Sequence, residues 1–242
     1  MKTVLITGAT SGIGKQLAID YARDHWQVIA CGRNEQALAE LAQQFETITP
    51  LRFDVTDLAQ TTQAIDSLDN TPDIWLLSAG DCEYIDEGVM DAALFERIFA
   101  INVMGVVNLV TAAQSRFSPG QRLAILGSIA SEVALPRAEA YGASKAAVSY
   151  LARTLQLDLK PKGVDVTSIF PGFVKTPLTD KNTFDMPMMV SVQSASDSIR
   201  RGLEKGVSTL YFPKRFTTLL RVFGALPYRW QTALVSRLLG SR

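Results

Sequence analysis

The chain begins with a short apolar run that leads directly into three closely spaced glycines. Residues 3–7 have the composition of a buried strand, and Gly8-Ala9-Thr10-Ser11-Gly12-Ile13-Gly14 follows before a helical pattern begins. Glycines at such a turn allow backbone to approach a phosphate, and the helix N-terminus offers free N–H groups and a positive dipole end. The segment predicts a dinucleotide-binding α/β fold, although a glycine cluster alone also fits an ordinary β-to-α turn.

Strand and helix patterns alternate along the rest of the chain. Strands are expected near residues 4–7, 27–31, 50–53, 73–77, 122–127, 164–170 and 209–212. Helices are expected near residues 15–23, 35–45, 58–67, 92–115, 143–160 and 195–204. This order predicts a single-domain, doubly wound (Rossmann) parallel sheet with helices on both faces and a site at the carboxyl ends of the strands.

Composition narrows the class of protein. With 242 residues, 47% of them hydrophobic, the chain can bury a large core, and its net charge of zero gives no general argument for nucleic-acid binding. Cys31 and Cys82 have neither disulfide-framework nor metal-ligand spacing, and no His/Cys/Asp cluster predicts a metal site. We expect a cytoplasmic protein, because the N-terminus has no secretory pattern and no run reaches the roughly 18 apolar residues of a membrane span.

A tyrosine and a lysine lie four residues apart in Tyr141-Gly142-Ala143-Ser144-Lys145. On a helix this spacing puts phenol and ammonium on one face, where the cation favours the ionised phenol. Bringing a phenol pKa near 10 to neutrality needs about 4 kcal/mol. One cation about 4 Å away supplies roughly that much before the lysine's own desolvation is subtracted, so a second positive charge, such as an oxidised nicotinamide, would help. The alternative is a solvated surface pair.

Further motifs occur in order around this pair. Asn102 and Ser128 precede Tyr141, Asp54-Val55 and Ala79-Gly80 lie earlier, and Pro171-Gly172-Phe173-Val174-Lys175-Thr176 follows. Together with the glycine turn, these motifs resemble the classical short-chain dehydrogenase/reductase family over residues 1–212. The resemblance implies an NAD(P)-dependent oxidoreductase that transfers a hydride between a nicotinamide and a carbonyl/alcohol substrate.

The resemblance also implies catalytic roles for four residues. Tyr141 would be the general acid in reduction and the base in oxidation, and Ser128 would hydrogen-bond the substrate oxygen. Lys145 would lower the phenol pKa and bind the nicotinamide ribose, while Asn102 would hold a water beside the lysine. Taken singly, each residue also has a structural interpretation: a solvated pair, a turn or cap serine, and a satisfied amide.

Cofactor binding is expected along the same edge of the sheet. The expected residues are Gly8, Thr10, Ser11, Gly12, Ile13, Gly14, Arg33, Asp54, Val55, Ala79, Gly80, Tyr141, Lys145, Pro171, Gly172, Val174 and Thr176. The second strand ends in Cys31-Gly32-Arg33-Asn34, where no carboxylate would repel a 2′-phosphate and Arg33 has the fork geometry to bind one. This predicts NADP(H) in preference to NAD(H), unless Arg33 is only a solvated surface residue.

The chain departs from the family pattern after its fourth strand. Leu77-Ser78-Ala79-Gly80 stands where the family commonly has Asn-Asn-Ala-Gly, and this puts the hydrogen bonding at the centre of the sheet in doubt. The short segment from Thr176 to Val192 falls where the family places a substrate lid and carries Phe184 and several methionines. It suits a small or medium hydrophobic substrate, although methionines are just as often core filler.

Residues 213–242 form the least family-like part of the chain. No acidic residue follows Glu204, whereas Lys214, Arg215, Arg221, Arg229, Arg237 and Arg242 all do. Apolar and aromatic residues recur there at helical spacing on both sides of Pro227. We expect a basic amphipathic helical extension that packs on the same domain or on a partner subunit, with weak peripheral membrane contact as the alternative.

Other functions remain open at this level. A non-catalytic NADP-binding redox sensor or scaffold of the same fold is one, but all four catalytic positions are filled. A nucleotide-sugar epimerase or dehydratase would usually need a larger substrate domain. The resemblance also implies a homodimer or homotetramer that pairs through the helices near residues 92–115 and 143–160.

Overall fold

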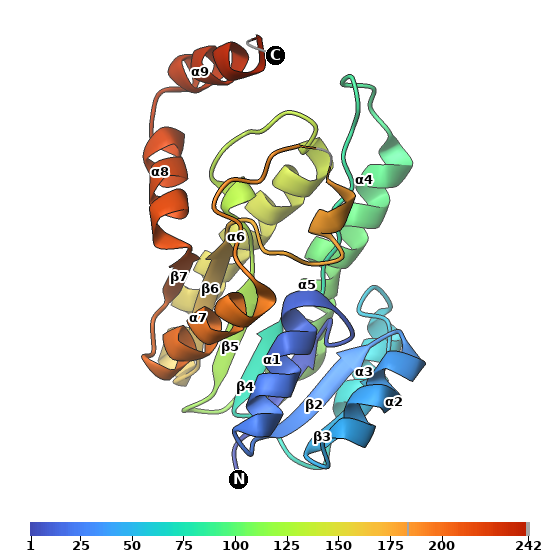
Figure 1. Ribbon diagram of the computed structural model, residues 1–242. Coiled ribbons are helices and arrows are strands. Elements are labelled where there is room, and N and C mark those ends of the chain that lie inside the picture. Colours follow the sequence, from blue (N-terminus) through green and yellow to red (C-terminus); the bar gives the residue numbers. More distant parts are fainter. Residues whose placement is uncertain (183, 241–242) are drawn as a thin grey trace.

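The computed structural model describes residues 1–182 and 184–240. Its described strands form one parallel sheet of seven in the order β3-β2-β1-β4-β5-β6-β7 (Figure 1). The strands are β1 Thr3–Thr7, β2 Gln27–Gly32, β3 Ile48–Arg52, β4 Ile74–Leu77, β5 Arg122–Leu126, β6 Asp165–Pro171 and β7 Thr209–Phe212. The doubly wound parallel sheet predicted from the alternating patterns is therefore confirmed.

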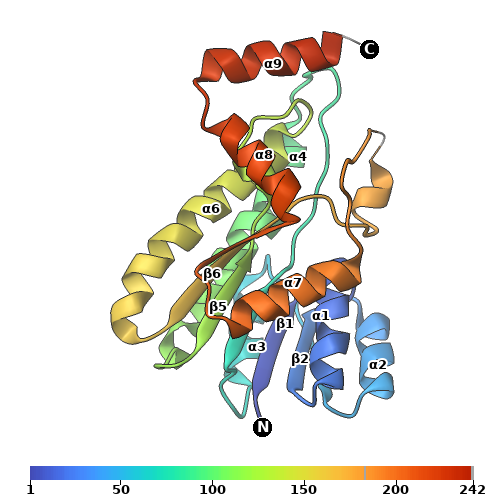
Figure 2. The same ribbon diagram turned by 60° about the vertical axis from the view of Figure 1, so that its left-hand side comes forward.

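Helices cover both faces of the sheet, as expected for a chain of βα units (Figures 1 and 2). One face packs against α1 Gly12–Arg23, α2 Glu35–Gln44 and α7 Val192–Glu204. The other packs against α3 Leu58–Asp66, α5 Gly105–Ala113 and α6 Glu139–Leu159. Side-chain alternation in β1 shows how the two cores are filled, because Val4 and Ile6 enter the first and Leu5 enters the second.

The helix expected over residues 92–115 is divided by a change of winding. It consists of α4 Ala92–Phe99, a π-helical turn over Ala100–Met104, and α5. An 18-residue window within the continuous stretch Ala92–Arg116 has a mean hydropathy of 1.6, so the stretch matches a membrane span by length and composition. Its apolar residues pack on the sheet and on α6 in this fold, as the apolar face of a core helix does. The expectation that no such stretch exists is therefore wrong by that measure.

The crevice of the sheet lies between β1 and β4, where the winding direction reverses. Ser78, which follows β4, ties these two strand ends together: its hydroxyl donates to the Thr7 carbonyl oxygen at 2.5 Å, and its N–H donates to the Thr7 hydroxyl at 3.1 Å. The N–H of Ala79 donates to the same hydroxyl at 3.1 Å. The shorter serine thus makes the cross-strand bonds, which resolves the doubt raised by its departure from the family pattern.

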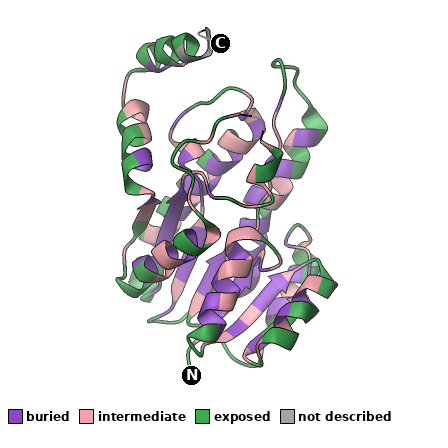
Figure 3. Cartoon of the chain, in the orientation of Figure 1, coloured by how far each residue is buried: buried purple, intermediate pink, exposed green. Residues whose placement is uncertain are grey.

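The chain leaves the sheet after β7 and ends in two helices. These are α8 Lys214–Gly224 and α9 Tyr228–Gly240, which are largely exposed in Figure 3. Phe216 on the inner side of α8 is buried, and its ring lies 5.4 Å from that of Phe173. Arg242, one of the basic residues counted above, lies outside the described residues. Short 3₁₀ turns occupy Gln114–Arg116, Ile129–Ser131, Lys160–Lys162 and Thr179–Lys181.

Candidate active site and cofactor cleft

A cavity of about 110 Å³ lies at the carboxyl edge of the sheet, beside the crevice. It collects residues that are far apart in sequence, from α1, from the ends of β4, β5 and β6 and from α6. Of the residues predicted for the site, the cavity is lined by Ile13, Gly80, Ser128, Tyr141, Lys145, Pro171, Gly172, Val174 and Thr176. The sheet therefore brings most of the predicted reaction centre to one place.

The glycine turn approaches its neighbours too closely to carry side chains. A Cβ at Gly14 would collide with the Gly8 carbonyl oxygen and lie 2.7 Å from the Ser78 hydroxyl. Gly8 has a positive φ of +68°, and a Cβ there would lie 2.9 Å from the Cα of Ala79. Gly12 lies beside Thr176, since its Cβ would be 3.2 Å from the Thr176 methyl group. These positions leave backbone exposed toward the cleft.

The first turn of α1 has free N–H groups directed at this cleft. Side-chain oxygens cap α2, α3, α4 and α7, through Asn34, Asp57, Asp91 and Ser191. In contrast, the N-cap residue Ser11 makes no side-chain cap bond, and no acidic residue occupies the first turn of α1. An uncapped helix N-terminus behind a glycine turn fits the pyrophosphate of a dinucleotide.

The far end of the cleft lies beside the end of β2. Gly32 leaves room for the turn, because a Cβ there would lie 2.7 Å from the Thr10 methyl group. The Arg33 side chain is 65% exposed and forms an ion pair with Asp54 at 3.5 Å. Burial opposes ionisation of Asp54, but hydrogen bonds from Thr56 and the charge of Arg33 together hold its pKa below the usual value. Arg33 is thus positioned at the cleft but already has an acidic neighbour.

Val55 is fixed by two residues that sequence reasoning did not single out. The Asn108 amide donates to the Val55 carbonyl oxygen at 2.9 Å, and Asn108 is buried. Gly105 lets α5 approach, since a Cβ there would lie 2.8 Å from a Val55 methyl group. A polar residue within an otherwise apolar helical run was the available sequence signal for Asn108.

Tyr141 lies in the first turn of α6, which begins at Glu139, four residues earlier than expected. Desolvation of the phenol raises the pKa of Tyr141 above its usual value, the nearby Cys82 adds to the rise, and a hydrogen bond with Ser128 opposes it. The lowering expected from Lys145 does not occur in the protein alone, because desolvation of the phenol is the largest influence on its pKa. At neutral pH the phenol is therefore protonated and able to donate.

Ser128 follows β5 and has a defined orientation. Its hydroxyl oxygen accepts a hydrogen bond from the Ala130 N–H at 3.1 Å, and its side chain is buried. Because the oxygen is engaged as an acceptor, the O–H remains available to donate toward the cavity and Tyr141.

Lys145 is buried behind the phenol. Its Nζ donates to the Leu126 carbonyl oxygen at 3.1 Å and lies 5.8 Å from the centroid of the Tyr141 ring. Only 6% of the lysine is exposed, and burial lowers its pKa to about 8. A Cβ at Gly80 would lie 3.3 Å from Nζ, so the glycine keeps the ammonium open to a hydroxyl in the cleft.

Asn102 lies in the π-helical turn, and both polar atoms of its amide group are hydrogen-bonded. The amide nitrogen donates to the Asp81 carbonyl oxygen and to the Ser144 hydroxyl, each at 2.9 Å, and the amide oxygen accepts from the Asp81 N–H at 2.9 Å. These contacts match the structural interpretation of the side chain. The amide oxygen accepts one hydrogen bond and has a second lone pair, so the expected contact with a water beside Lys145 stays a prediction.

We expect the buried ammonium to leave a measurable pH dependence of stability. The folded-state pKa of Lys145 is about 8 and its ordinary value is 10.5, so between these values the unfolded chain binds more protons. The free energy of unfolding should therefore rise with pH in this range. From pH 8 to 10, Lys145 should raise the free energy of unfolding of the unmodified protein by about 2 kcal/mol. The Lys145→Met variant should lack that rise, and urea unfolding of both proteins measures the difference. If the free energies of unfolding of the two proteins changed in parallel with pH, the lowered pKa of a buried Lys145 would be contradicted.

Cys82 and Tyr84 are site residues that sequence reasoning missed. Burial raises the pKa of Cys82 to about 11, and its thiol interacts with Tyr84, Lys145 and Tyr141. The pKa of Tyr84 is also raised, mainly by burial. Their place after β4, at the carboxyl edge, was the signal that could have indicated them.

A series of aromatic ring contacts begins beside this centre, where Tyr84 interacts with Tyr141. Phe184, from the lid segment, contacts Tyr84 with ring centroids 5.5 Å apart and Phe173 at 6.1 Å. Phe173 in turn contacts Phe216 of α8. The four rings join the lid, the loop after β4 and the C-terminal helix into one apolar wall.

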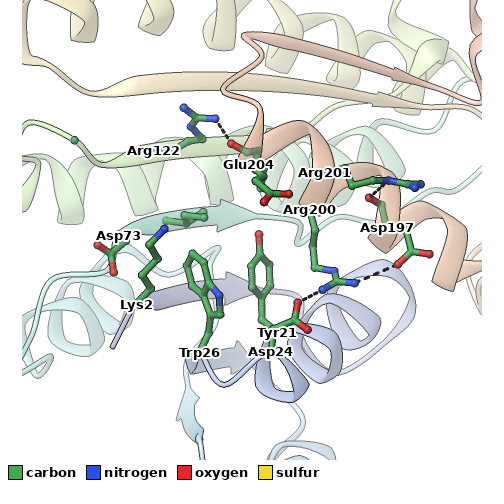
Figure 4. Close-up of a pocket in the computed structure, with 13 residues that line it drawn as sticks. Lys2, Tyr21, Asp24, Trp26, Asp73, Arg122, Asp197, Arg200, Arg201 and Glu204 are labelled. Atoms are coloured by element: carbon green, nitrogen blue, oxygen red, sulfur yellow. Dashed lines mark hydrogen bonds and ion pairs between the residues drawn. The ribbon is translucent and has the colours of Figure 1, made fainter.

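A larger cavity, of about 970 Å³, lies at the opposite, amino-terminal edge of the sheet (Figure 4). Three of its charged side chains are paired with one another, since Arg200 bridges Asp24 and Asp197, and Arg122 pairs with Asp165 outside the lining. It contains none of the predicted site residues. No cluster of His, Cys, Asp or Glu able to hold a metal occurs among the residues that the structure describes.

Comparison with known proteins agrees with this arrangement. The sequence model of the short chain dehydrogenases matches residues 2–186. An uncharacterized oxidoreductase of Myxococcus xanthus is 32% identical over 235 residues, 93% of each chain. The NADPH-dependent 1-acyldihydroxyacetone phosphate reductase of Saccharomyces cerevisiae is 32% identical over 189 residues, which cover 74% of this chain and 63% of that protein.

The same fold occurs in solved structures. A short chain dehydrogenase/reductase from Burkholderia phymatum in complex with NAD has a TM-score of 0.81 over 91% of this chain and 92% of that one, at 20% identity. At this identity the likeness shows the fold alone, whereas the family match and the Myxococcus relative carry the assignment. The chain belongs to the short-chain dehydrogenase/reductase family and is an oxidoreductase that uses a nicotinamide cofactor.

Proposed function

We propose that the protein transfers a hydride between NADP(H) and a small or medium, apolar carbonyl/alcohol substrate, with Tyr141 as the general acid/base. The observation that carries this proposal is the convergence of Ser128, Tyr141 and Lys145 on one cavity bordered by the glycine turn. A protonated phenol, a serine O–H and a buried ammonium are the groups that a carbonyl oxygen needs as negative charge develops on it.

The residues divide the work in reduction. When held by the glycine turn and Lys145, a reduced nicotinamide dinucleotide would supply the hydride that the carbonyl carbon accepts. The Ser128 O–H holds the substrate oxygen, and Tyr141 Oη gives its proton to that oxygen as the C=O bond becomes C–O–H. The Lys145 ammonium stabilises the phenolate that remains, and in oxidation the proton moves back to Tyr141.

Arg33 is the basis for proposing NADP(H). Its guanidinium lies at the end of β2, where a 2′-phosphate would be placed, and the yeast relative is NADPH-dependent. Binding a dianionic phosphate there would turn Arg33 from Asp54 toward the stronger anion.

We expect Arg33→Ala to raise the KM for NADPH about tenfold and to leave the KM for NADH nearly unchanged, because one charge-assisted contact to phosphate is lost. Arg23→Ala is a matched control, since Arg23 is 62% exposed and paired with Asp20 at the far end of α1. Steady-state kinetics with NADPH and with NADH measures the two KM values and their ratio in each variant. An equal effect on the two cofactors would remove Arg33 as the selecting residue.

The four-ring wall is the basis for proposing an apolar substrate. Tyr84, Phe173 and Phe184 are half-buried and offer ring surface to a ligand that reaches Tyr141, and the buried Phe216 packs behind Phe173. Following NADPH absorbance with graded ketones, aldehydes and quinones tests the whole proposal. We expect turnover that improves with apolar substituents, and no turnover with any of these carbonyls would overturn it.

Assembly and compartment complete the proposal. The outer side of α6 exposes Tyr150 and Leu157, 78% and 74% respectively, and the π-helical turn exposes 47% of Met104. These side chains favour a homodimer or homotetramer paired through the α4–α5 stretch and α6. Cys31 and Cys82 are both free thiols, which suits the cytoplasm.

A further inference from the structure

The two C-terminal helices present an unusual concentration of exposed apolar side chains. Leu219 and Val222 on α8 are each 62% exposed, and on α9 Tyr228 is 84%, Trp230 55% and Leu234 38% exposed. We call these five exposed residues, which belong to two helices and not to one side of a single helix, the C-terminal face. They follow one another within a span of sixteen positions, whereas the inner residues Phe216 and Gln231 are buried.

The charge of this region has one sign. From Lys205 to residue 240 there is no acidic residue, and the cations are Lys205, Lys214, Arg215, Arg221, Arg229 and Arg237. Arg221 lies over the Tyr211 ring, with its guanidinium carbon 4.2 Å from the centroid, so it is anchored to the sheet. Arg215, Arg229 and Arg237 are exposed beside the apolar side chains. The region thus combines exposed rings with a cationic fringe.

The helices hold this face away from the sheet. The two helices are joined through Gln231, whose amide donates to the Gly224 and Leu226 carbonyl oxygens at 2.9 and 2.8 Å. Since α8 leaves the carboxyl end of β7, α9 stands beyond the edge that holds the candidate site, as both views show (Figures 1 and 2).

We propose that the C-terminal face docks on the surface of an anionic lipid bilayer. Tyrosine and tryptophan place an apolar ring and a polar tip at the lipid headgroup level, and nearby arginines attract anionic headgroups. A second copy of the same face is a poorer occupant, because an isologous contact would bring two all-cationic regions together. This inference goes beyond the proposed function and does not depend on the substrate.

Docking would also direct the candidate site toward the membrane. Phe216 belongs to the inner side of α8 and to the four-ring wall, and a Cβ at Gly172 would lie 2.7 Å from its ring. The bilayer-facing helix is therefore continuous in packing with the apolar approach to Tyr141. For this reason, truncating the chain before α8 would damage the site, and point variants are the better test.

The test is flotation of the full-length protein with vesicles of phosphatidylcholine and phosphatidylglycerol at 7:3, against pure phosphatidylcholine. We expect binding to the anionic vesicles only, weakened by salt, with a blue shift of tryptophan emission. The shift is assigned to Trp230, because Trp75 is fully buried and Trp26 is half-buried at the amino-terminal edge of the sheet. Arg229→Glu with Arg237→Glu should lower the partition coefficient by at least about tenfold. The matched charge control is Lys160→Glu with Lys162→Glu. These two lysines are exposed in the turn that follows α6, at the end opposite to Tyr141, and their substitution should leave vesicle binding unchanged.

Trp230→Ser with Leu234→Ser gives a second, charge-neutral arm. Circular dichroism establishes that each variant is folded, and light scattering gives its oligomeric state. Weaker vesicle binding at an unchanged oligomeric state supports the proposal. No vesicle binding by the unmodified protein, equal binding by the Arg229/Arg237 variant, or dissociation of an oligomer without change in vesicle binding would overturn it. The last outcome would make the face a subunit contact.

Discussion

Replacing Tyr141 with phenylalanine is expected to lower kcat for carbonyl reduction by about 10²- to 10⁴-fold, the range for loss of a positioned general acid. The substitution removes one oxygen and keeps the ring, which lies 5.8 Å from Lys145 Nζ. Without that oxygen, Ser128 can still hold a substrate carbonyl, but no proton is poised for the developing alkoxide. Cofactor affinity should change little, because the phosphates are expected at the glycine turn.

Single-turnover kinetics and NADPH fluorescence titration separate these effects. Tyr150→Phe, nine residues along the same helix and 78% exposed, controls for a general effect of tyrosine substitution on α6. Turnover by Tyr141→Phe at the unmodified rate would show that another group donates the proton, and Tyr84 would then be the first alternative to test.

The second large effect is expected from Gly14→Ala, which should raise the dissociation constant for NADPH by about 10- to 100-fold. A methyl group there meets the Gly8 carbonyl oxygen, which belongs to the backbone, and the Ser78 hydroxyl, which is hydrogen-bonded to the Thr7 carbonyl oxygen. Relieving that overlap must move the glycine turn or the start of α1, at a cost of about 1–3 kcal/mol. The backbone N–H groups of the turn would then be displaced from the positions in which they can bind the phosphates of NADPH.

Gly142→Ala is the matched control, since a Cβ there meets its nearest neighbours at 3.7 and 4.0 Å, which are ordinary contacts. Isothermal titration with NADPH measures both variants, and thermal unfolding shows how much of the Gly14 effect is lost stability. Unchanged affinity in Gly14→Ala would mean that the pyrophosphate is bound elsewhere.

Strand positions were predictable from sequence because each is a short apolar run bounded by turn residues. β7 is predicted at its observed bounds, and the other strands begin and end within a few residues of expectation. Helix starts were less predictable: α6 begins at Glu139 rather than near residue 143, because helical hydrogen bonding extends through a turn with no apolar periodicity to mark it. The winding change at Ala100–Met104 leaves no composition signal at all.

The candidate site was predictable where motifs carry backbone constraints, and less so where environment decides the chemistry. The glycine turn and Ser128, Tyr141 and Lys145 come together as their order indicated. The direction of the Tyr141 pKa shift could not be predicted from sequence, because desolvation depends on packing that spacing alone does not reveal. Cys82 enters the site for the same reason, by its place in space rather than by any motif.

The π-helical turn has a consequence for the phase of the long helix that contains it. Leu94, Ile98, Asn102 and Val106 are all buried at intervals of four residues, which exceeds the 3.6 residues of an α-helical turn. In an unbroken α-helix, that interval would carry the buried stripe progressively round the cylinder and turn either Leu94 or Val106 to solvent. The wider turn absorbs the surplus residue, so one helix keeps both ends in register with the core while Asn102 stays aimed at Asp81.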